Sequence, residues 1–151
     1  MEQKFMDEAV KLAVENVLEG GKPFGAIIVK DGKIIGSGTN DSVSDNDPTA
    51  HAEIQAIRLA AQKWGEKELL GASMYASGHP CPMCLAAMHL TGFVKIYYAS
   101  ELDEVAETPL DVKPVYKEMR RPLNEQNIPL FRMQSSLPED PVQMWLKKQK
   151  G

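Results

Sequence analysis

The sequence predicts an α/β fold: a central mixed sheet of five strands with helices on both faces, in three layers. Stretches with helical periodicity alternate with short apolar runs that are typical of strands. Asp31-Gly32 between the first two runs is typical of a hairpin turn. Because a hairpin is antiparallel while strands joined through helices run parallel, we expect a mixed sheet. The length of 151 residues is that of one ordinary domain, so we expect one domain over residues 1–151.

The first half of the chain predicts two helices around the hairpin. A helix is expected over residues 3–20, where apolar residues recur at helical spacing before Gly20-Gly21 ends the pattern. Strands are expected over residues 24–30 and 33–40, on either side of the turn. A second helix is expected from about residue 49 to residue 65.

The second half of the chain continues the alternation of predicted helices and strands up to residue 100, and beyond that residue the pattern becomes weaker. Residues 101–129 are rich in prolines and charges and predict only short helical patches. The terminal helix has acids at its start and lysines at its end, which suits the helix dipole. The elements expected here are a strand over 72–77, a helix over 80–92, a strand over 93–100, a strand over 130–136 and a helix over 138–150.

Composition narrows the classes of function. Hydrophobic residues make up 43% and charged residues 25% of the chain, as in ordinary globular proteins. The formal net charge of −4 gives no general attraction to nucleic acid, so none is expected as a partner. No apolar run is long enough to predict a membrane span. Two cysteines do not make a disulfide framework, so we expect reduced thiols and a cytoplasmic protein.

Both cysteines lie in the segment SGHPCPMCLAAMHL. Cys81 and Cys84 are three residues apart, so they share one face at the start of the predicted helix. Helix starts favour the thiolate, because unpaired N–H groups and the positive end of the dipole lie there. This arrangement suits two metal–sulfur bonds and equally a redox pair, so the segment alone leaves both open.

A third metal ligand is offered by the segment PTAHAEIQ, which places His51 and Glu53 at the start of another helix. If both helices begin at one edge of the sheet, His51, Cys81 and Cys84 would surround a zinc ion and leave a fourth position for water. Zinc lowers the pKa of bound water, and Glu53 would accept its proton. Helical spacing alone does not direct His51 and Glu53 to one atom, because residues i and i+2 lie on different faces.

The HAE and PCPMC segments together resemble the zinc deaminase superfamily with the cytidine deaminase-like fold. The resemblance extends to PFGAIIVKDGKIIGSGTN and NDPTAHAEIQAIRLA, and it is closest to the bacterial guanine deaminase and tRNA adenosine deaminase branch. It implies one Zn²⁺ per subunit on His51, Cys81 and Cys84, with a bound water or hydroxide, and Glu53 as the proton shuttle. It also implies a homodimer, in which the C-terminal segment of about residues 136–151 is exchanged between subunits.

The same resemblance implies residues for the substrate. Asn40 matches an amide that binds the base, and Phe24 matches an aromatic wall. His79 stands where the family usually has Glu, which implies a place beside the pocket. Guanine deaminases carry an acid where this chain has Val112, so Asp111 just before it is a candidate for an exocyclic amine. This chain also lacks their terminal tyrosine. Without the resemblance, each residue also has an ordinary structural interpretation. Asn40 would be a turn residue, Phe24 a core residue and Asp111 an acid in a surface loop.

The expected function is therefore a zinc-dependent hydrolytic deaminase of a small amino-substituted nucleobase. The first candidate reaction converts guanine to xanthine and ammonia. The alternatives are deamination of cytosine or another purine or triazine base, and deamination of adenosine in tRNA. A further alternative is a non-enzymatic zinc protein, in which His79 completes a closed site of four ligands. No role is assigned to His89.

Overall fold

The computed structural model describes residues 2–41 and 45–151. The chain divides into two units, Met1–Arg120 and Arg121–Gly151, and each is described here by itself. The single domain expected from the length therefore stays a prediction.

The first unit contains the predicted alternation of helices and strands. Each predicted element up to residue 100 is present, with ends that differ by up to three residues. The elements are α1 (Gln3–Leu18), β1 (Gly25–Lys30), β2 (Lys33–Thr39), α2 (Ala52–Trp64), η1 (Glu66–Leu69), β3 (Ser73–Gly78), α3 (Pro82–Thr91), β4 (Lys95–Ser100), η2 (Leu102–Val105) and α4 (Lys113–Met119).

The sheet is mixed, as expected, but it has four strands where five were predicted. The strand order is β2-β1-β3-β4; β1 is antiparallel to both of its neighbours, and β3 pairs with β4 in parallel. The prediction of a strand over residues 130–136 is wrong, because this segment has no strand structure. A strand needs a neighbour for its backbone N–H and C=O groups, and the apolar pattern of a segment does not reveal whether one is present.

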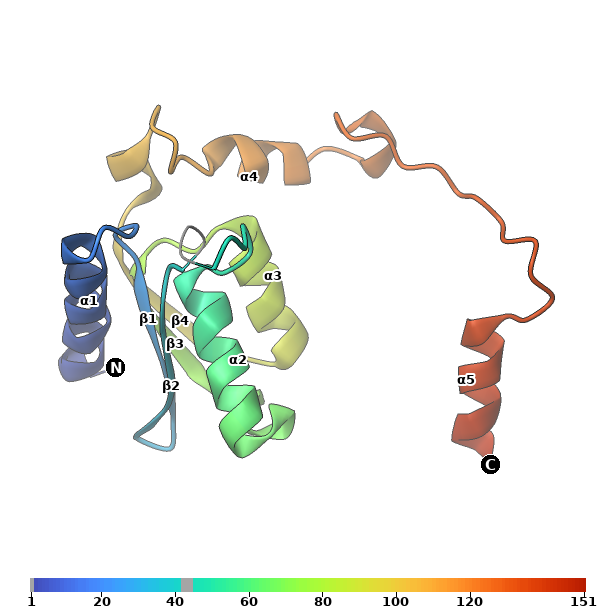
Figure 1. The fold of residues 1–151 in the computed structure, drawn as a ribbon, viewed down its shortest axis with the longest axis horizontal. Coiled ribbons are helices and arrows are strands. Elements are labelled where there is room, and N and C mark those ends of the chain that lie inside the picture. The colour runs from blue at the N-terminus through green and yellow to red at the C-terminus, as the bar shows by residue number, and fades with distance from the viewer. Residues whose placement is uncertain (1, 42–44) are drawn as a thin grey trace. The chain divides into compact units, whose positions relative to one another are not determined.

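Three layers follow from the alternation of side chains along β1. Ile27 and Val29 lie in the core shared with α1, whereas Ala26 and Ile28 lie in the core shared with α2 and α3. Figure 1 shows α1 on one side of the sheet and both other helices on the opposite side. The core on the side of α2 and α3 also contains Ala52, Ala56, Ala60, Leu69, Ala72, Met74, Ala76, Cys81, Cys84 and Met88.

Helix α2 packs directly on the backbone of β2. A Cβ atom on Gly38 would lie 2.4 Å from the Ala52 carbonyl oxygen, and one on Gly36 would lie 2.6 Å from the Ala56 carbonyl oxygen. Because small residues face one another, the helix approaches more closely than larger side chains would allow. This contact fixes the start of α2 at the edge of the sheet where β2 ends.

The second unit contains η3 (Leu123–Glu125) and α5 (Pro141–Lys150). The terminal helix was predicted, and Asp140 caps it by accepting a hydrogen bond from the Gln143 backbone N–H at 3.1 Å. None of the side chains of residues 121–151 is buried, and the exposed ones include the apolar Val142, Trp145 and Leu146. Among the described residues, no helix combines the length and the apolar character needed to cross a membrane.

Candidate active site

Four segments meet at one edge of the sheet. Strands β2 and β3 are both antiparallel to β1, so they end at the same edge, and α2 and α3 begin there. Strand β4, parallel to β3, also ends at this edge, and Phe24 precedes β1 there. The predicted convergence of two helix starts is therefore present.

His51 lies just before α2 and not in its first turn. The helix begins at Ala52, and His51 is its N-cap in an extended conformation, with φ −70° and ψ 157°. Glu53 follows in the first turn. The helical spacing rule consequently does not apply between these two residues, because an extended residue directs its side chain independently of the helix. Cys81 has the same position before α3, with φ −76° and ψ 169°.

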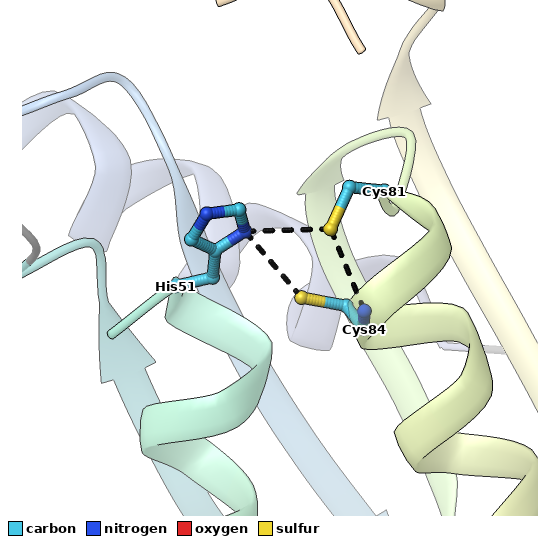
Figure 2. Close-up of side chains that lie close together, drawn as sticks. All are labelled: His51, Cys81 and Cys84. Atoms are coloured by element: carbon cyan, nitrogen blue, oxygen red, sulfur yellow. Dashed lines mark hydrogen bonds between the residues drawn. The ribbon is translucent and has the colours of Figure 1, made fainter. Parts of the chain in front are cut away.

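The side chains of His51, Cys81 and Cys84 form a potential metal site (Figure 2). Their ligand atoms all lie within 4.8 Å of one another. The His51 Nδ1 atom lies 3.5 Å from the Cys81 Sγ atom and 3.6 Å from the Cys84 Sγ atom. A tetrahedral zinc ion with ordinary bonds to nitrogen and sulfur separates such a pair by about 3.5 Å. Distances and donor types therefore both fit zinc with three protein ligands.

Without a metal the two thiols share a proton unequally. The Cys84 thiol donates a hydrogen bond to Cys81, which lowers the pKa of Cys81 to about 4 and raises that of Cys84. The Cys84 backbone N–H also donates to the Cys81 Sγ atom, at 3.5 Å. The pKa of His51 is raised, chiefly by its hydrogen bond with Cys81. The site thus already stabilises a thiolate, the form that binds metals.

Glu53 is the buried acid beside this cluster. It is 7% exposed. Burial raises the pKa of its carboxyl. A carboxyl with a raised pKa takes up and releases a proton closer to neutral pH than an exposed one does. This property suits a proton shuttle.

The cluster opens into a cavity of about 120 Å³. This space exceeds that of a single water, so a small molecule can enter. Its lining combines His51, Glu53 and Cys81 with residues of two further segments, 100–105 and 109–112. The lining residues are Lys22, Phe24, Asn40, His51, Ala52, Glu53, Gly78, His79, Cys81, Ser100, Glu101, Leu102, Val105, Pro109, Leu110 and Val112.

Both expected substrate residues line this cavity. Asn40 follows β2 and is 6% exposed, and its backbone N–H donates to the Phe24 carbonyl oxygen at 3.2 Å. The Phe24 ring packs against Gly78, where an added Cβ would lie 2.9 Å from the ring. Gly78 therefore makes room for the ring at the cavity wall.

His79 lines the cavity but lies outside the metal cluster. Its Nδ1 atom donates to the Pro80 carbonyl oxygen at 2.9 Å, and its ring contacts Tyr98 and Tyr116 at centroid distances of 4.6 Å and 5.7 Å. The Tyr116 hydroxyl donates to the same carbonyl. His79 thus does not complete a closed site of four ligands, which removes the basis for the structural-zinc alternative.

Asp111 is not brought to the cavity. One of its carboxylate oxygens accepts from the Glu107 backbone N–H at 2.9 Å, and the other accepts from the Lys113 backbone N–H at 3.0 Å. Its neighbours Leu110 and Val112 line the cavity instead. The carboxylate stabilises the loop, and Asp111 is not among the residues that line the cavity. His89 is exposed in the last turn of α3.

The sequence did not reveal the part of the cavity wall that residues 101–112 form. This wall comes from η2 and the loop that precedes α4, a segment without periodic signal. Lys22 was also not predicted to line the cavity, although its position two residues before Phe24 could have suggested it. Tyr116 was missed because its contact is with a backbone carbonyl 36 residues away.

The comparisons with known proteins agree with this geometry. Residues 1–100 match the model of the cytidine and deoxycytidylate deaminase zinc-binding region. Guanine deaminase of Bacillus subtilis (strain 168) is 42% identical over 144 residues, which cover 95% of this chain and 92% of that protein. The X-ray structure of guanine deaminase from Bacillus subtilis matches with a TM-score of 0.86 and 42% identity, over 97% of this chain and 95% of that chain.

More distant relatives match a smaller part. The tRNA-specific adenosine deaminase of Agrobacterium fabrum (strain C58 / ATCC 33970) is 40% identical over 79 residues, about half of each chain. A guanine deaminase structure from Nitrosomonas europaea matches with a TM-score of 0.65 and 27% identity, over 73% of this chain and 64% of that chain.

Proposed function

The chain belongs to the cytidine and deoxycytidylate deaminase family, and from this premise we propose that it is a zinc-dependent guanine deaminase. The reaction hydrolyses guanine to xanthine and ammonia. The observation that carries the proposal is the likeness to Bacillus subtilis guanine deaminase over 95% of this chain. The cluster of His51, Cys81 and Cys84 beside a cavity supports it.

In this proposal His51, Cys81 and Cys84 hold one zinc ion per subunit, with a water molecule in the fourth position. Bound zinc supplies acidity, because it lowers the pKa of the coordinated water towards neutrality. Glu53 would take one proton from this water, as the water oxygen adds to the ring carbon that bears the amine, and would deliver it to the neighbouring ring nitrogen. Glu53 would then take the remaining proton of the added hydroxyl group and pass it to the amine nitrogen, so that ammonia leaves as the C=O bond forms. Burial of Glu53, which raises its pKa, supports this role.

The substrate is oriented by the cavity walls. The Phe24 ring contacts the face of the base, and the Asn40 amide forms hydrogen bonds with its edge. His79 also lines the cavity, and its ring orientation is fixed by the hydrogen bond from Nδ1 to the Pro80 carbonyl oxygen. Asp111 has no part in the proposed site, because it does not line the cavity.

The proposed assembly is a cytoplasmic homodimer in which residues 136–151 pack on the other subunit. Helix α5 supports this arrangement, because Val142 and Trp145 are 63% and 60% exposed. Exposed apolar side chains of this size gain stability when a partner buries them. Free thiols in Cys81 and Cys84 suit a reducing compartment.

Ammonia release tests the activity directly. The zinc-loaded protein is incubated with guanine, adenine, cytosine and an amino-substituted triazine, and ammonia is measured. We expect turnover of guanine at a kcat/KM at least about tenfold above the next base. Turnover of another base alone would contradict the substrate, and release from none of them would contradict the activity.

Glu53→Gln tests the proton shuttle. The amide keeps the shape but cannot take a proton from water, so kcat should fall by roughly 10³-fold while zinc stays bound. Glu66→Gln is the matched control, because Glu66 is an exposed carboxylate in the first turn of η1 that does not line the cavity, and its kcat should equal that of wild type. If Glu53→Gln released ammonia at the wild-type rate, the mechanism would be wrong.

A further inference from the structure

Asn16 is a buried polar residue that the proposed chemistry does not use. It lies in the last turn of α1, on the far side of the sheet from the metal ligands, and is 8% exposed. Its Nδ2 atom donates two hydrogen bonds, to the Lys22 carbonyl oxygen at 2.8 Å and to the Asn40 carbonyl oxygen at 3.0 Å. Both acceptors belong to residues that line the cavity.

The side chain is not needed to end the helix. The Gly20 backbone N–H donates to the Val17 carbonyl oxygen at 2.9 Å, and the Gly21 N–H donates to the Asn16 carbonyl oxygen at 2.7 Å. This pair of bonds, with Gly20 at φ +92°, is a Schellman motif that satisfies the end of α1 through the backbone alone. The amide of Asn16 is therefore free to hold other segments.

The two segments that the Asn16 amide connects lie just beyond the last hydrogen-bonded pair of β1 and β2. The last pair of the β1–β2 ladder is Gly25 with Thr39, and Phe24 and Asn40 follow on either side. One backbone bond, from the Asn40 N–H to the Phe24 carbonyl oxygen at 3.2 Å, continues beyond that pair. Asn16 adds the bonds that the ladder no longer provides.

The backbone of Lys22 links the Asn16 amide to Phe24. Its carbonyl oxygen accepts from Asn16 and also from the Phe24 backbone N–H, at 2.9 Å. A Cβ atom on Gly21 would lie 2.5 Å from the Asn16 Nδ2 atom, so only glycine leaves room for the amide there. One buried amide thus connects the backbones of both walls that are proposed to contact the base.

We propose that Asn16 is a positioning residue that sets how far apart Phe24 and Asn40 stand, and hence how tightly the cavity binds a planar base. The identity of the base rests on the proposed function, whereas the link between the two walls does not. A shift of Phe24 or Asn40 changes the contacts that would hold the base and therefore raises KM. Glu53 and the cysteines belong to α2 and α3, to which the two Asn16 hydrogen bonds do not lead, so kcat should change less.

The variants are Asn16→Asp, which keeps the shape but removes both donors, and Asn16→Ala, which removes the side chain. Ala9→Gly is the matched control, because Ala9 is a fully buried residue of the same helix that does not line the cavity. We expect KM for guanine to rise about tenfold or more in both Asn16 variants. The value of kcat should stay within about threefold of wild type and zinc content should be unchanged. Ala9→Gly should lower the melting temperature and leave KM unchanged.

Hydrogen exchange provides a readout that does not depend on the substrate. The Asn40 amide donates to Phe24, and it should exchange at least about tenfold faster in Asn16→Ala than in wild type or Ala9→Gly. Unchanged exchange of Asn40 would overturn the inference, as would a wild-type KM in both variants. Unfolding of both variants with loss of zinc would also overturn it, since Asn16 would then be required for the fold as a whole. Inactivity of the wild-type protein towards guanine, by contrast, would refute only the proposed substrate.

Discussion

The two ends of the cavity are built in different ways. At the metal end, His51, Glu53, Cys81 and Cys84 stand at the starts of two regular helices that pack on the sheet. The second part, here called the loop wall, is formed by residues 101–112. It consists of a 3₁₀ turn and a loop that local hydrogen bonds hold together.

This difference teaches which parts of the site tolerate change. Helix starts are fixed by many core contacts along the helix, so the ligand positions depend on the whole fold. The loop wall depends on a few turn interactions, such as the capping box between Glu101 and Glu104. We therefore expect changes at the metal end to abolish chemistry and changes at the loop wall to alter binding alone.

The largest effect is expected for Cys84→Ser at the metal end. A serine hydroxyl is a far weaker zinc ligand than a thiolate, so zinc affinity should fall by more than about 100-fold and deamination should stop. Zinc content after dialysis measures the effect. His79→Ala is the control and should retain one zinc per chain, because His79 lies outside the cluster. Zinc loss in His79→Ala would show that this histidine is a ligand.

Gly38→Ala is expected to disturb the metal end through the fold. The added Cβ would lie 2.4 Å from the Ala52 carbonyl oxygen, so the start of α2 must shift. Overpacking of this kind costs about 1–3 kcal/mol and should lower the melting temperature by about 3–10 °C. A reduced kcat should accompany it, because His51 and Glu53 move with α2. Ser37→Ala, the neighbouring position in β2, is the control; equal effects in both variants would argue against the close contact as the cause.

Val112→Ala tests the loop wall. Val112 lines the cavity and packs partly on the core, and its side chain is replaced by a smaller apolar one. Loss of apolar contact with the base should raise KM about tenfold and leave kcat and zinc content unchanged. Steady-state kinetics with guanine as the substrate measures KM and kcat separately. A fall in kcat at constant KM would contradict the division between the two ends.

The same division explains what the sequence predicted. The cluster of His51, Cys81 and Cys84 was expected because HAE and PCPMC mark two helix starts. The expectation required both starts to lie at one edge of the sheet, and the structure meets that condition. The direction of the His51 side chain was not predictable from helical spacing, because the residue is extended and lies one position before the helix.

The wall from Glu101 to Val112 could not be predicted, since its order comes from side chains that cap backbone groups nearby. Asp111 illustrates the point. Its position in the sequence suggested contact with a ligand, yet the N–H groups of Glu107 and Lys113 already occupy its carboxylate. Asn16 was missed for a related reason: a polar residue near a helix end carries no signal for a bond to Asn40, 24 residues away.

The smallest effect is expected for Asp111→Asn, which tests how the loop wall is held. Glu107 has φ +63°, a left-handed conformation that costs energy outside glycine, and Asp111 accepts the N–H of this residue. The two backbone hydrogen bonds lower the pKa of Asp111 below its ordinary value of 3.8. The carboxylate therefore stabilises the fold fully above that value, and its contribution is lost as the pH falls through the lower pKa of the folded state.

Because Asp111 is charged in the folded protein at pH 7, Asp111→Asn should lower the melting temperature there, by at most about 2 °C. The difference between variant and wild type should shrink as the pH falls below 3.8 and through the lower pKa of the folded state, because the wild-type side chain then becomes protonated as well. Thermal unfolding across this pH range measures it. A difference that stayed constant with pH would show that shape, and not charge, holds this loop, and the wall would then resemble the metal end more closely than its hydrogen bonds imply.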